Sequence, residues 1–439
     1  MNTDIRLKCH TSITKTAITF QLDGLDDIEH LAIRSEGKLR TKLISNEFQI
    51  RIDNDFFGAT DFNSGHLSGD RLCLALLIVF TPTFTAISSD KVQRDYFNIN
   101  DFQEFDNVYL DVDFEVSDSL KHLFKKTWLF PKLSIETTSI NPDLTNDFNP
   151  NPRTSLAWGG GLDSTASVLI YDEFPNCDYY YLDSVENEKA KNFSSVYGYN
   201  VPTVITNCKH IYSDGGFPNW VAPILPAILR GDSICFLGTT MSTMISDGFI
   251  YRYNRNLWLD ASNICGMIQC TAHCISEYSA SELVYNAGLS RFICGINCSE
   301  WGVSYKALRK ALYMASLDES FYPDVEFFES KGLVIDFDNP FSERSKFSMD
   351  IVESAIRLQD KNIRFKSIDS ISDKISSFQQ SWNLKAPLST SLPFIGYTPN
   401  HVLEYLEIKF SNLGIPIMSE SDLENFKSYD YMKIVQSSK

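Results

Sequence analysis

The stretch Trp158-Gly159-Gly160-Gly161-Leu162-Asp163-Ser164-Thr165 is the most informative part of the chain. The short segment 155–157 before it predicts a buried strand, and residues 166–171 after it predict a helix. Glycines allow a backbone to approach a ligand closely, and the first N–H groups of a helix point at negative oxygens. A strand, a glycine turn and a helix that opens with hydroxyl side chains therefore indicate a polyphosphate site.

Within this loop we expect the glycines and the first residues of the helix to bind a nucleotide: Gly159, Gly160, Gly161, Asp163, Ser164 and Thr165. The hydroxyl groups add donors, and Asp163 holds a metal ion or orients the loop. The alternative is a glycine-rich turn before an ordinary helix. We favour nucleotide binding because Asp-Ser-Thr follows the glycines in frame after a strand. The loop is not a Walker A motif, because no Gly-Lys-Ser/Thr follows the glycines.

The loop resembles the Ser-Gly-Gly-x-Asp-Ser signature of the PP-loop ATP pyrophosphatases, with Gly159 where the signature has serine. The resemblance implies ATP and Mg²⁺ as ligands. It also implies a loop that grips the leaving pyrophosphate while a substrate oxygen attacks the α-phosphorus, which gives an adenylated intermediate. Catalytic roles for Asp163 and Ser164 follow from the same resemblance.

The order of sequence features after the loop indicates which PP-loop family the chain resembles. A Gly-Phe-Pro-Asn-Trp segment, a strand that ends in Leu-Gly, a Ser-x-x-Glu capping box and a Cys-x3-Cys pair precede an arginine. These features lie at Gly216–Trp220, Gly238, Ser279–Val284, Cys294–Cys298 and Arg309. Over residues 155–315 this order resembles the cyano-deazaguanine synthases (QueC-type), a PP-loop family. QueC-like proteins with extra domains and altered zinc knuckles also occur in bacterial antiviral gene clusters.

The zinc knuckle of that family has three cysteines at positions that are Trp301, Ser304 and Ala307 in this chain. Trp and Ala cannot bind zinc and Ser is a poor ligand, so we expect no knuckle of the family type. Nearby cysteines and histidines form an alternative ligand set, but we favour buried free cysteines because no Cys-x2-Cys pair is present. That set is Cys265, Cys270, His273, Cys274, Cys294 and Cys298.

The amino-acid composition limits the kinds of partner that we expect. The chain has 439 residues, with 39 Lys and Arg against 56 Asp and Glu and a net charge of −17. Nucleic-acid binding needs clustered basic side chains, so nucleic acid is not an expected partner. The N-terminus lacks the pattern of a signal peptide, and the longest apolar run, Leu72–Phe80, is too short to span a bilayer. Ten cysteines fit reduced thiols or metal ligands, so we expect a cytoplasmic protein without a membrane segment.

Alternating apolar residues predict a strand-rich first part of the chain, with strands at Ile18–Leu22, Phe48–Ile52 and Leu110–Val116. In the last of these strands, Asp111, Asp113 and Glu115 share one face. We expect that face to be solvated rather than a metal site, because carboxylates two residues apart in one strand repel without converging on an ion. A helix is predicted over residues 117–124.

From residue 155 to 315 strands and helices alternate, which predicts an α/β fold with a doubly wound, mostly parallel sheet and ligands at the carboxyl ends of its strands. The predicted strands are 155–158, 178–182, 201–205 and 233–237, and the predicted helices are 189–197 and 220–230. The loop would then share one edge with Asp183, Asn207 and Gly238. We expect Asp183 to bind adenine or a metal ion, or to cap a helix.

These patterns divide the chain into four parts. Residues 1–136 form a strand-rich domain, and residues 137–154, rich in Asn and Pro, form a linker. Residues 155–330 form the PP-loop ATP-binding domain, and residues 331–439 form a partly helical extension. Within the extension, helices are predicted at 349–360 and 401–410 and a loop at 389–396.

Adenylation needs positive charge against the triphosphate, which is the role expected of Mg²⁺ and of basic side chains. We assign catalytic roles to Arg252 and Arg309, and the other candidates are Arg255, Lys306 and Lys310. An ordinary surface location is the alternative for all five side chains.

Three functions follow from these residues and from the resemblance. The leading one is ATP-dependent adenylation of a carboxylate or amide oxygen with release of pyrophosphate. The acceptor that the resemblance implies is a deazaguanine-type small molecule, or a partner protein from the same gene cluster in an antiviral defence system. The second function is tRNA modification with the same loop, against which the acidic composition counts. The third is a non-catalytic nucleotide-binding scaffold, indicated by Gly159 and by the missing knuckle cysteines.

Overall fold

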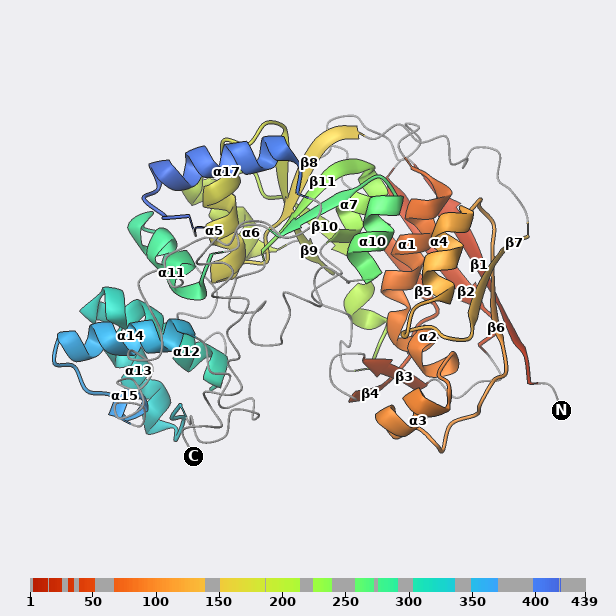
Figure 1. Ribbon diagram of the computed structural model, residues 1–439, viewed down its shortest axis with the longest axis horizontal. Helices are drawn as coiled ribbons and strands as arrows, with labels where there is room; N and C mark the ends of the chain where they lie inside the picture. Colours follow the sequence, from red (N-terminus) through yellow and green to blue (C-terminus); the bar gives the residue numbers. More distant parts are fainter. Residues whose placement is uncertain are drawn as a thin grey trace. The chain divides into compact units, whose positions relative to one another are not determined.

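The computed structural model (Figure 1) contains two compact units. The residues that the structure describes are 3–14, 16–25, 31–34, 39–51, 67–138, 151–185, 187–213, 224–238, 257–271, 275–290, 303–335, 349–369, 398–417 and 419. The first unit comprises Met1–Ala157, Pro175–Cys235 and Arg255–Gln269, and the second comprises Trp158–Phe174, Phe236–Asn254 and Cys270–Lys439.

A ten-stranded mixed sheet forms the centre of the first unit, in the order β12-β11-β8-β9-β10-β5-β2-β1-β6-β7. Its strands are β1 Ile5–Ile13, β2 Ala17–Asp23, β5 Glu47–Arg51, β6 Val108–Val112, β7 Leu133–Thr137, β8 Asn151–Ala157, β9 Cys177–Asp183, β10 Thr203–Thr206, β11 Asp232–Leu237 and β12 Ile268–Thr271. A separate hairpin consists of β3 Leu31–Arg34 and β4 Leu39–Lys42, which pair antiparallel.

One part of the sheet has the strand order of a doubly wound fold. Strands β8, β9 and β10 are parallel neighbours, with Thr154 opposite Cys177 and Thr203 opposite Tyr181. On the other side of β8 lies β11 and then β12, so the order in the sheet is 5-4-1-2-3 when β8 is counted as the first strand. In such sheets the direction of winding changes at the first strand, and ligands bind beside its carboxyl end. The prediction of an α/β fold is confirmed.

The N-terminal strands continue the same sheet. Strand β10 pairs antiparallel with β5, with Thr206 opposite Ile50. Strand β2 is antiparallel to both of its neighbours, β5 and β1, and β1, β6 and β7 are parallel. The strands up to residue 137 and the strands from residue 151 onward therefore belong to one sheet, whereas the sequence suggests two domains joined by a linker at 137–154.

Helices of the first unit form a layer in which α1 packs against α7 and α10, and α4 packs against α10 (Figure 1). The helices are α1 Gly69–Val79, α2 Thr81–Ile87, α3 Lys91–Phe97, α4 Asp118–Lys125, α6 Glu188–Tyr197, α7 Leu225–Arg230 and α10 Leu257–Ile264, with a 3₁₀ turn at Cys208–His210. The first part of the chain thus contains helices that its strand-rich pattern did not predict.

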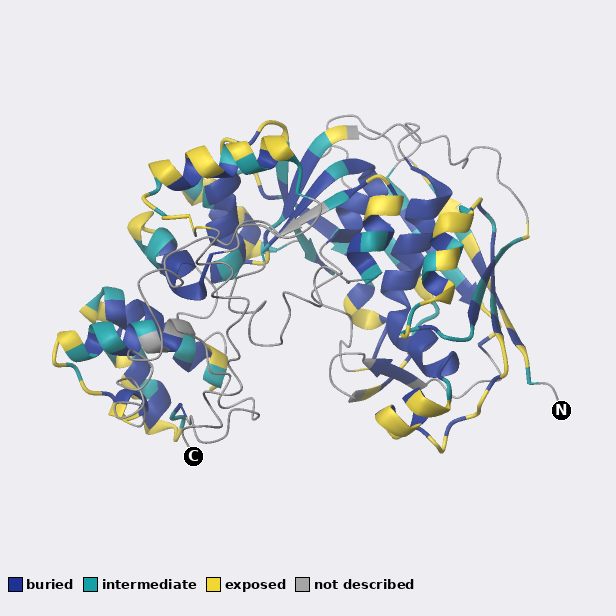
Figure 2. Ribbon diagram, viewed as in Figure 1, coloured by how far each residue is buried: buried dark blue, intermediate teal, exposed yellow. Residues whose placement is uncertain are grey.

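The apolar run Leu72–Phe80 accounts for the most buried of these helices. Every residue of α1 is buried, as Figure 2 shows, because a helix that is apolar on all sides needs cover on all sides. Within the described residues, no single helix is long and apolar enough to cross a membrane. Helices α1 and α2 pass that test only together, and they meet at an angle of 76°.

The second unit is mostly helical among its described residues, which also include the last residues of β11 and β12. Its elements are α5 Leu162–Tyr171, α11 Glu277–Asn286, α12 Tyr305–Leu317, a 3₁₀ turn at Glu319–Phe321, α13 Tyr322–Ser330, α14 Met349–Asp360, α15 Lys366–Asp369 and α17 Asn400–Asn412. Helix α5 packs against α11 and α17, while α12 packs against α11, α13 and α14. The helices predicted at 349–360 and 401–410 are confirmed, and the loop predicted at 389–396 lies outside the described residues.

Two local predictions are wrong. The strand predicted to reach Val116 ends at Val112. Of the three acidic residues on the predicted solvated face, Glu115 is exposed and Asp113 partly so, but Asp111 is buried beneath Arg6 of the neighbouring strand, which donates to it at 2.5 Å. The capping box predicted at Ser279 lies inside α11. Ser276 caps that helix instead, since its hydroxyl oxygen accepts from the N–H of Ser279.

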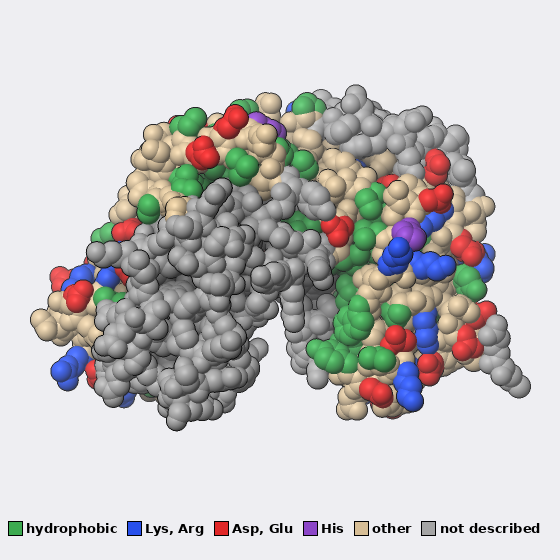
Figure 3. Space-filling view, viewed as in Figure 1, with side chains coloured by type: hydrophobic (Ala, Val, Ile, Leu, Met, Phe, Trp, Pro, Cys, Tyr) green, Lys and Arg blue, Asp and Glu red, His purple; other side chains and the backbone are tan. Residues whose placement is uncertain are grey.

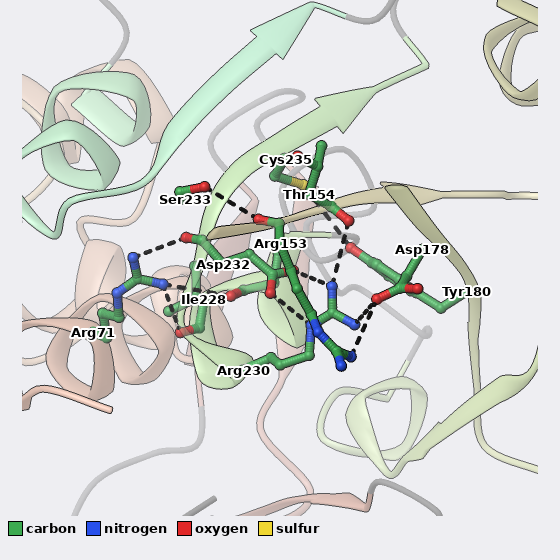
Figure 4. A network of polar contacts seen from close by, with 11 residues as sticks. Arg71, Arg153, Thr154, Asp178, Tyr180, Ile228, Arg230, Asp232, Ser233 and Cys235 are labelled. Carbon is green, nitrogen blue, oxygen red and sulfur yellow. Dashed lines mark hydrogen bonds and ion pairs between the residues drawn. The ribbon is translucent and has the colours of Figure 1, made fainter. Parts of the chain in front are cut away.

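Two buried arginines, Arg71 and Arg230, form hydrogen bonds that connect several elements of the first unit (Figure 4). Arg230 makes a two-pronged ion pair with Asp232 at 2.6 and 2.7 Å and reaches Asp178 at 2.6 Å. Asp232 is fully buried. Burial alone would lower the pKa of Arg230, but the carboxylates of Asp232 and Asp178 outweigh it and raise the pKa, whereas burial raises the pKa of Asp232 itself. The two short contacts between Arg230 and Asp232 are those of a two-pronged ion pair.

The buried pair gives a stability prediction. Replacing Arg230 with Met leaves the Asp232 carboxylate buried without its cation, so we expect the free energy of unfolding to fall by about 3–5 kcal/mol. The double variant Arg230→Met/Asp232→Leu should recover part of that loss. Urea titration measures both.

Arg153 provides the matched control, because it faces the same Asp178 carboxylate at 3.6 Å from a partly exposed position. Arg153→Met should lower the free energy of unfolding by less than about 1 kcal/mol. Equal urea midpoints for Arg230→Met and Arg153→Met would contradict the role given to the buried pair.

Candidate functional site

The glycine loop connects the end of β8 to the start of α5. Gly160 has a φ of 69°, a conformation that residues with a side chain rarely adopt. Gly161 is the N-cap of α5, with φ −97° and ψ 173°, and no side chain caps the helix there. Gly161 has no side chain with which to cap the helix, and the positive end of the helix dipole stands at the loop.

The two hydroxyl groups after the loop bond within it. The Ser164 Oγ accepts from the N–H of Gly159 at 3.0 Å and donates to the carbonyl oxygen of Gly161 at 3.2 Å. The Thr165 Oγ1 donates to the same carbonyl oxygen at 2.8 Å and accepts from the indole N–H of Trp158 at 2.9 Å. Thr165 is fully buried. These hydroxyl groups give the loop its shape.

Gly238, which directly follows β11, approaches the start of α5. A Cβ atom at Gly238 would lie 3.1 Å from the Cα atom and 3.2 Å from the backbone nitrogen of Ser164, so only glycine fits without a shift of the backbone. The structure thereby brings together two of the predicted site segments, the glycine loop and Gly238. They follow β8 and β11, which are neighbours in the sheet.

Helix α12 carries the described basic candidates of the second unit, and α11 carries Glu277. Arg309 forms an ion pair with the buried Glu277 at 3.0 Å, and Lys310 is buried. Lys306 is exposed. The surrounding protein and the like charge of Lys310 lower the pKa of Lys306, while the carboxylates of Asp163 and Glu277 act in the opposite direction. The charge of Asp163 thus acts to raise the pKa of Lys306, and Arg309 donates a hydrogen bond to Glu277 at 3.0 Å.

Several predicted residues fall outside the described part of the chain. They are Arg252, Arg255, Trp301, His273 and the cysteines at 274, 294 and 298. Of the positions that correspond to knuckle cysteines, Ser304 is the N-cap of α12 and accepts from the N–H of Ala307 at 3.2 Å, and Ala307 is buried. Cys265 is buried as a free thiol.

Asp183 and Asn207 belong to the first unit. Asp183 accepts hydrogen bonds from the N–H of Ser184 at 2.7 Å, from Asn187 at 2.8 Å and from Lys209 at 2.6 Å. Burial alone would raise the pKa of Asp183, but these bonds outweigh it and lower the pKa. The cap of α6 is Asn187, not Asp183. Asn207 fastens β10 to β5, because its side chain bonds the backbone of Gln49 and Glu47.

The carboxyl end of α5 has supports that the sequence analysis missed. Tyr405 on α17 donates to the carbonyl oxygen of Ile170 at 2.6 Å, and Lys409 bonds Asp172 at 2.6 Å and Glu173 at 2.8 Å. A lysine at the negative end of a helix is stabilising. The spacing of Tyr405 and Lys409, four residues apart on one helix, is the only sequence signal for this contact.

Within the described residues, no group of three or more His, Cys, Asp or Glu side chains is placed to hold a metal ion. Comparisons of the chain with protein-family models, with curated proteins and with solved structures find no match. The role of the site is therefore inferred from its own residues.

The close approach of Gly238 gives a second prediction. Gly238→Ala places a Cβ atom against the backbone of Ser164, so we expect the free energy of unfolding to fall by about 1–3 kcal/mol. At Gly161 a Cβ atom would meet nothing within 4 Å, and φ is negative. Gly161→Ala should therefore change the stability by less than about 1 kcal/mol. Thermal unfolding of the two variants checks the difference, and equal loss in both would refute the packing argument.

Proposed function

We propose that the protein binds ATP at residues 158–165 and transfers its adenylyl group to a carboxylate or amide oxygen, with release of pyrophosphate. This is the PP-loop type of chemistry, and the QueC-like resemblance of the sequence agrees with it. The observation that carries the proposal is the glycine loop at the start of α5, held by Ser164 and Thr165, with Gly238 packed against it.

The geometry supports phosphate binding in a specific way. The first N–H groups of a helix point out of its start and favour an anion there, since the helix dipole is positive at that end. The loop follows the first strand of a doubly wound order, where ligands bind in α/β proteins. Both hydroxyl groups are bonded within the loop, so the backbone supplies the donors and the hydroxyls hold them in position.

Charge near the loop supports adenylyl transfer. Lys306 contributes positive charge that offsets the charge developing on the leaving pyrophosphate. Asp163, in the first turn of α5, carries a carboxylate of the kind that binds Mg²⁺ together with phosphates. A magnesium ion held there would neutralise part of the charge of ATP. Arg309 donates to the buried Glu277 through one of its five N–H groups, and it is a further cationic group on α12.

The acceptor is proposed from the resemblance alone. It is a carboxylate on a deazaguanine-type molecule, or a carboxylate or amide on a partner protein. A tRNA acceptor is disfavoured by the net charge of −17. On the face drawn in Figure 3, Lys and Arg side chains of the described residues are interspersed with Asp and Glu rather than gathered in a stripe.

A non-catalytic nucleotide-binding role is the second candidate. The observations that favour it are Gly159 in place of the serine of the PP-loop signature and Ser304 as a helix cap in place of a knuckle cysteine. A protein of this kind binds ATP and releases no pyrophosphate, which separates the two candidates in one assay.

The test is pyrophosphate release from Mg·ATP by the purified protein with candidate acceptors. Asp163→Asn and Lys306→Ala should each lower kcat by about 10²-fold, because each removes a charge that faces the triphosphate. The matched controls are Asp172→Asn, at the opposite end of α5, and Lys331→Ala, an exposed lysine after α13. Neither control should change kcat by more than about twofold, since surface charges far from a site contribute little.

The outcomes are distinct. Binding of ATP without release of pyrophosphate supports the scaffold role. Rates that are equal in the wild type, Asp163→Asn and Lys306→Ala would refute catalysis at this loop. Absence of ATP binding in the wild type would refute both candidates.

A further inference from the structure

We propose that Trp158 is a positioning residue for the glycine loop, and that it acts through Thr165. Its indole N–H fixes the Thr165 hydroxyl group, which in turn fixes the carbonyl group of Gly161. The inference rests on the proposed function, because the groups that it positions are the donors for phosphate. It adds a residue that lies before the glycines and outside the sequence signature.

The contacts form a short relay. Trp158 donates to the Thr165 Oγ1 at 2.9 Å, and this hydroxyl group donates to the Gly161 carbonyl oxygen at 2.8 Å. A hydroxyl group has one hydrogen to donate. Because the indole N–H can only donate, it occupies the oxygen as an acceptor and leaves that hydrogen for Gly161. Trp158 is 3 % exposed and Thr165 is fully buried, so water does not compete for these bonds.

The carbonyl group of Gly161 is the target of three donors. They are the N–H of Thr165 at 3.1 Å, the Ser164 Oγ at 3.2 Å and the Thr165 Oγ1 at 2.8 Å. All three lie in the first turn of α5, so the carbonyl group points into the helix. A trans peptide unit is planar, with its C=O and N–H groups pointing in opposite directions. The N–H of Leu162 therefore points out of the helix start, toward the position of an anion.

The same relay keeps an unfavourable group away from the ligand. A carbonyl oxygen carries partial negative charge, and it would repel a phosphate if the peptide between Gly161 and Leu162 turned over. Gly161 has no side chain to restrain that rotation. The bonds from Ser164 and Thr165 supply the restraint, and the indole of Trp158 orients the second of them.

The test is the affinity for Mg·ATP, measured by titration calorimetry on the full chain. Trp158→Phe keeps an aromatic ring and removes the N–H, and Thr165→Val keeps the shape and removes the hydroxyl group. Each should weaken binding by about fivefold, the effect of one hydrogen bond. Thr165→Ser keeps the hydroxyl group and should bind as the wild type does. Trp128→Phe, half exposed in the first unit, is the control for loss of a tryptophan.

A double variant decides whether Trp158 acts through Thr165. In that case Trp158→Phe/Thr165→Val binds Mg·ATP as tightly as Thr165→Val alone, because the relay is already broken. Multiplied effects, about 25-fold in the double variant, would overturn the inference, since they mean that the two residues act separately. Unchanged affinity in Trp158→Phe would also overturn it.

Two further comparisons distinguish a failure of a variant to fold, and a failure of the proposed function, from a failure of this inference. If Trp158→Phe does not fold, the contrast between Thr165→Val and Thr165→Ser still decides, because equal affinities in those two variants overturn the relay. If the wild type itself does not bind Mg·ATP, the proposed function fails and this inference fails with it. Normal binding by the wild type with no effect of Trp158→Phe overturns this inference alone.

Discussion

The buried guanidinium group of Arg71 is the interaction on which the first unit depends. It is fully buried on α1 and donates to five carbonyl oxygens, those of Ala227, Ile228, Asp232, Cys265 and Gly266. Two of them belong to the last turn of α7, and two follow the end of α10, so one cation meets the negative ends of two helices. Burial lowers the pKa of Arg71 to about 10, which leaves the group charged at neutral pH.

This contact explains why the N-terminal part and the α/β part form one unit. Alternation in the sequence indicates where strands lie, and it predicts β2, β5, β9, β10 and β11 correctly. It does not say which strands pair. The pairing of Ile50 with Thr206, which joins the two parts of the sheet, depends on residues far apart in the chain. The burial of Arg71 could not be predicted from the sequence either, because nothing local distinguishes a buried arginine from a surface arginine until its partners are known.

The candidate site likewise has features that the sequence predicts and features that depend on tertiary contacts. The glycine loop, its helix and Gly238 could be predicted, since local patterns of glycine and hydroxyl residues indicate them. The direction of the hydroxyl groups could not, because Ser164 and Thr165 fit a phosphate and the Gly161 carbonyl group equally well by residue type. The sequence predicts Arg309 as a candidate cation for the triphosphate, and it does not indicate that Arg309 pairs with the buried Glu277 of another helix. Such pairings arise from tertiary packing.

Gly159 stands where the PP-loop signature that the loop resembles has serine. A Cβ atom at this position would meet only the Ser164 Oγ, at 3.7 Å, which is an ordinary contact. Serine would therefore fit here, and its absence is not a steric requirement of the fold. The N–H of Gly159 is already held by the Ser164 Oγ, so the loop keeps its geometry without a side chain at its first position. Compared with serine, glycine lacks one hydroxyl group, so the difference concerns the hydrogen-bonding groups of the loop rather than the fold.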